Sequence, residues 1–135
     1  MLETIKNNKI IYAIIIRSNY NKEGPNFFTD NKDRLQIGSL IYKKGKLIEP
    51  HYHRDIKRFS DKSAEVLFIK KGKIKVKFYC NKTYKFLEEK ILNSNDTILL
   101  QDGAHGFEVV EDVEMIEAKL GPYHQDDLIR IKKNK

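Results

Sequence analysis

The stretch EVLFIKKGKIKVKFY, residues 65–79, carries the clearest fold signal in the chain. Its second half alternates apolar residues with lysines, which is typical of a strand with one buried and one solvated face. Its first half is a short apolar run, and Gly72 lies between the halves, where a chain can turn. The stretch is therefore predicted to form a β-hairpin that bends at Gly72. Its expected core residues are Leu67, Ile69, Ile74, Val76 and Phe78.

Similar short runs recur along the chain and are separated by glycine, asparagine and aspartate residues that favour turns. Many short strands in 135 residues predict an all-β protein, a sandwich or a barrel, with a single domain over residues 1–135. No long helical pattern occurs, and only a short turn near residues 125–131 is expected. The expected strands are residues 10–16, 35–42, 66–69, 73–79, 84–92, 97–100, 107–110 and 113–120.

The composition narrows the class of protein. The net charge is +7, but the lysine face of residues 73–77 lacks the interleaved aromatic side chains that stack on bases, so nucleic-acid binding is not expected. The longest apolar run, Ile10–Ile16, is far shorter than the roughly 20 residues of a membrane span. Cys80 is the only cysteine, so an internal disulfide is excluded. With a polar N-terminal stretch, these features favour a cytoplasmic protein without a membrane partner.

The apolar run Ile10–Ile16 also bears on assembly. It offers few polar positions for a solvent-facing side, so both faces of this strand should be covered. In a small barrel the second cover could be another subunit, and we therefore expect a homodimer.

Three of the four histidines stand where strands are expected to begin. His51 and His53, in EPHYHRD (49–55), would lie on one side of a strand and could converge on one ion. Glu65 alternates with core residues of its strand, so its carboxylate should point inward and needs a partner, which a cation can supply. His105, in DGAHGF, alternates in the same way with Phe107 and Val109.

These residues resemble the two motifs of the cupin family. Gly45, five residues, His51-x-His53, then Glu65, six residues and Gly72 match the first motif, and NDTILLQDGAHGF (95–107) resembles the second. The resemblance covers residues 35–120. It implies a double-stranded β-helix, or jelly roll, with His51, His53, Glu65 and His105 as ligands of one divalent metal ion.

Two features refine this resemblance. Eleven residues, 54–64, separate His53 from Glu65 where the motif has three or four, so we expect an inserted, exposed loop at the barrel mouth. The stretches at residues 65–79, HGFE and MIEAKLGPY further resemble small cupins associated with polysaccharide and sugar biosynthesis. That likeness implies a small-molecule ligand, a sugar or sugar nucleotide.

The ligand set predicts a borderline divalent ion, namely Zn, Ni, Fe or Mn. Open positions on such an ion would suit an isomerase or epimerase of sugars, and if the ion is iron, a dioxygenase. A small-molecule-binding cupin without turnover is the alternative from another class. Arg54, near the predicted barrel mouth, would suit an anionic substrate.

Glu117 and Lys119, in VEMIEAKL, depend on the register of the last strand. In one register both point into the barrel, where Glu117 would be a catalytic general base and Lys119 a substrate contact. In the other register Ile116, Ala118 and Leu120 are buried and the two charged residues face water. Propensity does not choose between these registers.

Overall fold

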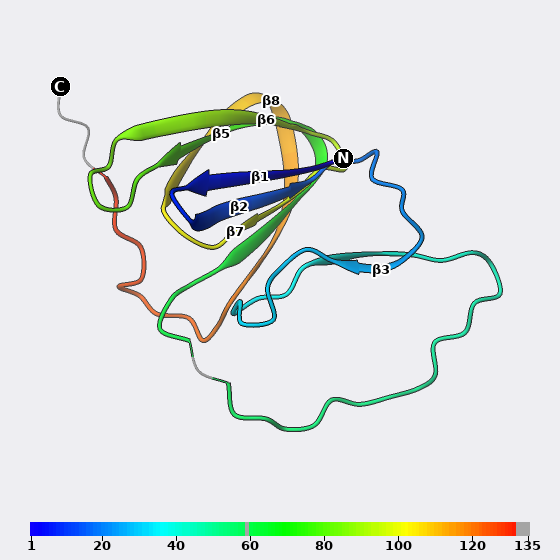
Figure 1. The fold of residues 1–135 in the computed structure, drawn as a ribbon. Coiled ribbons are helices and arrows are strands. Elements are labelled where there is room, and N and C mark those ends of the chain that lie inside the picture. The colour runs from blue at the N-terminus through cyan, green and yellow to red at the C-terminus, as the bar shows by residue number, and fades with distance from the viewer. Residues whose placement is uncertain (59, 132–135) are drawn as a thin grey trace.

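The computed structural model describes residues 1–58 and 60–131. Within these residues the chain is all-β and has no helix, which confirms the predicted class (Figure 1). The larger antiparallel sheet has the order β1-β2-β7-β5-β6, with β8 also paired to β5, and β3 and β4 form a separate pair. The strands are β1 (Leu2–Asn7), β2 (Ile10–Ile16), β3 (Gly24–Phe27), β4 (Gly38–Ile41), β5 (Glu65–Tyr79), β6 (Phe86–Asn93), β7 (Thr97–Leu100) and β8 (Ala104–Lys119).

Residues 65–79 form one long bent strand, so the predicted hairpin is wrong. β8 pairs with β5 along its whole length, from Glu65↔Lys119 to Tyr79↔Ala104, with register shifts around residues 69–74. The other edge of β5 pairs with β7 in its first half and with β6 in its second half. Gly72 has a φ of 95°, and a Cβ there would run into the carbonyl oxygen of Asp112. Only glycine lets β5 and β8 bend together at this point.

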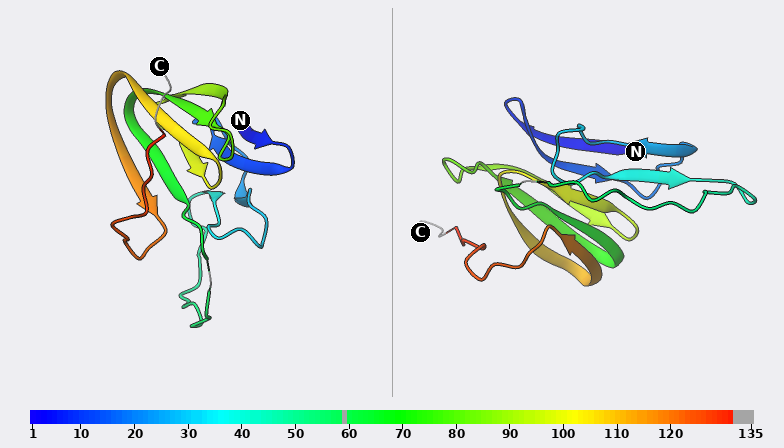
Figure 2. Two further views of the ribbon diagram at one scale, coloured as in Figure 1. Left: turned by 90° about the vertical axis from the view of Figure 1, so that its left-hand side faces the viewer. Right: turned by 90° about the horizontal axis from the view of Figure 1, so that it is seen from below.

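The bend folds the sheet around an inner core, and the curl is clear in Figure 2. The predicted core residues Leu67, Ile69, Ile74, Val76 and Phe78 are all buried. They pack with residues from β1, β2, β6 and β7, including Ile5, Ile15, Leu92 and Ile98. The alternation in residues 65–79 therefore identified the buried face correctly, even though the two halves are not paired with each other.

A second, smaller core lies on the other face of β2 and β7. Ile14 and Leu99 pack there against Ile37 and Ala64. Both faces of β2 are thus covered, as predicted, but the second cover comes from this chain's own segments rather than from another subunit. The homodimer therefore stays a prediction.

The curled sheet is a half-barrel and does not close. Val109 and Phe107 lie opposite Ile74 and Val76 and so face the same side as the inner core. Their exposed fractions are nevertheless 59% and 43%, because no strand of the described chain covers that side.

A buried carboxylate fixes the corner between β6 and β7. Asp96 is 1% exposed and accepts hydrogen bonds from the backbone N–H groups of Ser18 and Asn93 and from the guanidinium of Arg17, at 2.8–2.9 Å. These contacts tie the end of β2 to the corner where the neighbour of β5 changes from β6 to β7. From the sequence, Asp96 was expected only to be part of a turn.

Several strand boundaries differ from the predicted ones. β2 and β7 match their predicted limits, whereas β4 covers only part of residues 35–42. Residues 107–110 and 113–119 belong to the single strand β8, which ends one residue before the predicted limit, and β1 and β3 were not predicted. Apart from residue 59, which lies outside the described residues, the predicted loop 54–64 has no strand or helix. The expected turn near residues 125–131 is present at 125–126.

A search of the described residues for a helix with the length and hydropathy of a membrane span finds none.

Candidate functional site

The bend of β5 brings the two ends of this strand together. Glu65 begins β5, and His105 lies opposite Phe78 near the end of β5. Although Phe78 is thirteen residues from Glu65 along the strand, the Nε2 atom of His105 is 2.6 Å from the Oε1 atom of Glu65. Two residues proposed from the sequence are therefore in direct contact across the mouth of the half-barrel.

The β5–β8 register adds two more of the proposed residues. Glu117 lies opposite the buried Leu67, and Lys119 lies opposite Glu65. Residues that face each other across a ladder share a side of the sheet, so Glu117 and Lys119 belong to the concave side. Ile116 lies on the outer side and is exposed. Of the two registers left open by the sequence, the structure has the one that turns Glu117 and Lys119 toward Glu65.

The two carboxyl groups of the site have opposite pKa shifts. A hydrogen bond from His105, supported by Glu117 and the charge of Lys119, lowers the pKa of Glu65 to about 2 against the opposing effect of burial. The pKa of Glu117 is raised, chiefly because it shares a hydrogen bond with Glu65 and also through burial. The two neighbouring carboxyl groups disfavour each other's ionisation, and of the two Glu117 is the one that holds its proton more strongly.

The cluster lies at a cavity of about 830 Å³, although Glu117 is not among the residues that line it. Glu65, His105 and Lys119 line it together with Tyr79 and Asn81. The C-terminal segment, including Tyr123 and His124, forms another wall. This volume is in the range of small-molecule sites, roughly 300–1,000 Å³. The C-terminal wall was not predicted from the sequence, because residues 121–131 have no periodic pattern of apolar residues.

The remaining proposed residues lie elsewhere. His51, His53 and Arg54 are exposed and belong to the segment between β4 and β5, which has no strand over residues 42–64 apart from the undescribed residue 59. His51 Nδ1 is 2.9 Å from the carbonyl oxygen of Glu49, and the two imidazole rings pack edge to face with centroids 5.4 Å apart. The expected strand face that would aim both rings into the barrel is absent here. Figure 1 shows this segment as a long excursion from the sheet.

The donor groups do not fit the predicted four-ligand metal site in this arrangement. Glu65 and His105 direct their polar atoms at each other rather than at a shared point. Across residues 1–58 and 60–131, no three His, Cys, Asp or Glu side chains are grouped as an ion would require. Metal binding by His51, His53, Glu65 and His105 stays a prediction. Comparison of the chain with protein-family models, curated proteins and solved structures found no match.

The cluster has the groups needed for proton transfer. A neutral imidazole that donates its Nε2–H to Glu65 has its lone pair on Nδ1 and can act as a base. Glu117, whose pKa is raised beside the ionised Glu65, is the better proton donor of the two carboxyl groups. Lys119 adds a positive charge at the same cavity.

Proposed function

We propose that the chain is an enzyme that isomerises or epimerises a small polar molecule by acid–base proton transfer. The observation that carries this proposal is the 2.6 Å contact between Glu65 and His105 beside a carboxyl group, Glu117, with a raised pKa. Moving a proton between the carbons next to a carbonyl needs one group that accepts a proton and one that donates it. Neighbouring titratable groups whose pKa values are shifted apart can serve as that proton acceptor and that proton donor.

In this mechanism His105 removes a proton from the carbon beside the substrate carbonyl, and the C–H electron pair forms the double bond of an enol. Glu117 gives its proton to the carbonyl oxygen as negative charge develops there. For isomerisation, His105 returns the proton to the neighbouring carbon while Glu117 takes the proton of the other hydroxyl group of the enediol. For epimerisation, solvent water gives a proton to the opposite face of the same carbon, and His105 releases its proton to solvent. Glu65 stays ionised and stabilises the imidazolium that forms on His105.

Lys119 provides the proposed contact for an anionic or polar substituent of the substrate. It lines the cavity and lies opposite Glu65 in the β5–β8 ladder. The resemblance to cupins of polysaccharide and sugar biosynthesis favours a sugar or sugar nucleotide. Arg54, the other basic residue proposed from the sequence, lies on the exposed segment and has no part in this mechanism.

The resemblance also supports a finer description of the fold and of the metal. We propose that the curled sheet is the core of a cupin double-stranded β-helix, which the segment before β5 would complete by pairing along an open edge. The metal site and the iron-dependent dioxygenase alternative both require that rearrangement, because it would have to bring His51 and His53 to Glu65 and His105.

A deuterium-exchange experiment tests the proposed function. The protein is incubated in D₂O with a panel of keto sugar nucleotides, and NMR follows loss of the proton beside the carbonyl. We expect exchange with the native chain, and a decrease of about 10²–10⁴-fold in the variants His105→Asn and Glu117→Gln. His51→Asn is the control, because its ring is remote from the cavity in this structure, and it should exchange at the native rate.

Three outcomes decide between the alternatives. Undiminished exchange in His105→Asn would contradict the proposed mechanism. Saturable binding of a sugar nucleotide without exchange would favour the binding protein. Equal losses in His51→Asn and His105→Asn would favour the metal site instead.

A further inference from the structure

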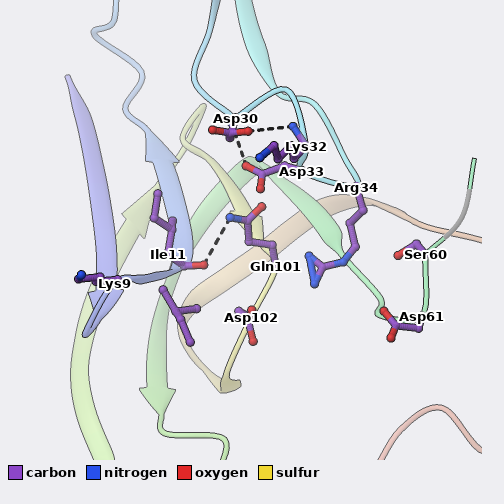
Figure 3. Close-up of a pocket in the computed structure, with 11 residues that line it drawn as sticks. Lys9, Ile11, Asp30, Lys32, Asp33, Arg34, Ser60, Asp61, Gln101 and Asp102 are labelled. Carbon is purple, nitrogen blue, oxygen red and sulfur yellow. Dashed lines mark hydrogen bonds between the residues drawn. The ribbon is translucent and has the colours of Figure 1, made fainter.

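A second cavity, of about 590 Å³, adjoins the first: Gln101 and Asp102 line both, whereas Glu65 and His105 line only the first. Its walls are the β1–β2 turn with the start of β2, the loop that joins β3 to β4, and the residues that follow β7, as Figure 3 shows. None of the residues proposed from the sequence lines it. Its volume is also in the range of small-molecule sites, about 300–1,000 Å³.

The feature that points to a ligand is the side chain of Gln101. This residue is 8% exposed, and its Nε2 donates a hydrogen bond to the carbonyl oxygen of Ile11 at 3.4 Å. Its Oε1 atom is buried and has no hydrogen-bond partner in the described part of the chain. Exchanging the side-chain oxygen and nitrogen of Gln101 would not supply a partner, because it would place the side-chain oxygen against the carbonyl oxygen of Ile11.

Figure 3 shows the Oε1 atom of Gln101 on the side of Asp33 and Arg34, away from Ile11. Buried acceptors in folded proteins are almost always partnered. A buried acceptor without a partner, beside a cavity, therefore indicates a donor that is not part of the chain.

The mixed charges of the lining make a single cation or anion a poor ligand for this cavity. Four carboxylates and three cationic side chains line the cavity, so an ion of either sign meets like charges as well as opposite ones. Asp33 and Asp30 already accept backbone N–H groups of the same loop, and Asp102 is paired with Lys62 at 3.6 Å. The residues that line the cavity are Lys9, Ile10, Ile11, Asp30, Lys32, Asp33, Arg34, Ser60, Asp61, Gln101 and Asp102.

A hydroxyl group suits this mixed lining, since it can donate one hydrogen bond and accept others. We propose that this cavity binds a neutral polyhydroxylated molecule, a sugar or a cyclic polyol. One hydroxyl donates to Oε1 of Gln101, a second donates to the carboxylate of Asp33, and a third accepts from the guanidinium of Arg34. Ile10 and Ile11 provide an apolar wall for the C–H groups of the ring.

An NMR titration of the full, ¹⁵N-labelled chain with D-glucose and with myo-inositol tests this site. We expect saturable shifts of backbone amides at residues 9–11, 30–34 and 101–102. Gln101→Leu removes the acceptor and puts an apolar side chain of similar size in its place. This variant should bind the probe about tenfold more weakly. Asn21→Leu makes a similar change at an exposed position that lines neither cavity, and this variant should bind as the native chain does.

Arg34→Gln is a second variant that does not alter the buried amide, and it should also weaken binding of the same probe. The site would be overturned by an absence of saturable shifts at those residues, or by native affinity in both Gln101→Leu and Arg34→Gln. Shifts with ammonium or calcium chloride but not with either polyol would overturn the ligand class. A crystal grown with the polyol that showed only water on Oε1 would do so too. Residues 9–11 and 30–34 lie at this cavity alone, so shifts there identify this site separately from the cavity of the proposed enzyme activity.

Discussion

Two regions of the molecule carry histidines that the sequence analysis assigned to the same site, and the structure treats them differently. His105 lies on β8, in a ladder with the bent strand β5, and its ring meets Glu65 at 2.6 Å. His51 and His53 lie on a segment without strand pairing and are exposed. The same residue type acquires a defined partner only where a neighbouring strand fixes the direction of its side chain.

The local composition of the two regions explains the difference. Residues 104–119 alternate well enough to pair along fifteen residues of β5. The segment around His51 contains Gly45 and Pro50 and many charged residues, and its apolar side chains Leu47, Ile48 and Tyr52 are exposed. A segment that buries little apolar surface gains little free energy from ordering.

Gly72→Ala should have the largest effect on stability, because Gly72 lies at the bend that β5 and β8 share. Its φ of 95° disfavours any side chain, and a Cβ would collide with the backbone of Asp112. We expect a loss of roughly 3 kcal/mol or more in the free energy of unfolding, measured by urea denaturation. Gly45→Ala is the matched control, with a φ of 94° but no atom within 4 Å of the added Cβ, and should cost only about 1 kcal/mol. Equal costs for the two variants would show that the clash at Asp112 is not real.

Removing His51 and His53 together tests whether the exposed region joins the site in solution. In the arrangement described, the variant His51→Ala/His53→Ala should keep its thermal stability within about 0.5 kcal/mol, as is usual for exposed substitutions. If the predicted metal site forms, the native chain should retain a divalent ion in elemental analysis and the double variant should lose it. His105→Ala would then lose the ion as well. Metal retained at equal stoichiometry in the double variant would end the four-ligand hypothesis.

The contact between Glu65 and His105 should be visible in the pH dependence of the free energy of unfolding. The pKa of Glu65 is lowered in the folded chain from 4.5 to about 2, so its stabilisation is fully present above pH 4.5 and is lost as pH falls through 2. Glu65→Gln should therefore cost roughly 1–2 kcal/mol at neutral pH, with allowance for the partial solvent exposure of the pair. The difference between native chain and variant should shrink as pH falls from 4.5 toward 2. A difference that is constant with pH would mean that Glu65 is not the group responsible.

Glu117→Gln should have the smallest effect, and of opposite sign. A raised pKa in the folded chain means that ionised Glu117 is disfavoured beside Glu65, so the native chain loses stability as pH rises above 4.5. The neutral glutamine removes that repulsion, and we expect a gain of no more than about 0.5 kcal/mol at neutral pH because the group is mostly exposed. Melting curves at pH 4 and pH 7 would show the gain only at pH 7. A destabilised variant at pH 7 would contradict the close approach of the two carboxyl groups.

The sequence by itself determined the all-β class, the limits of β2 and β7, and the buried residues of β5. These features follow from alternation and turn residues, which act between neighbours in the chain. It also singled out Glu65, His105, Glu117 and Lys119 as candidates, each from its position in an alternating run. Only the tertiary structure decided that residues 65–79 form one bent strand, because a glycine between two apolar runs is compatible with both a hairpin and a bend. It alone set the register that turns Glu117 inward and left His51 and His53 on an unpaired segment, since register and pairing depend on contacts between residues far apart in the chain.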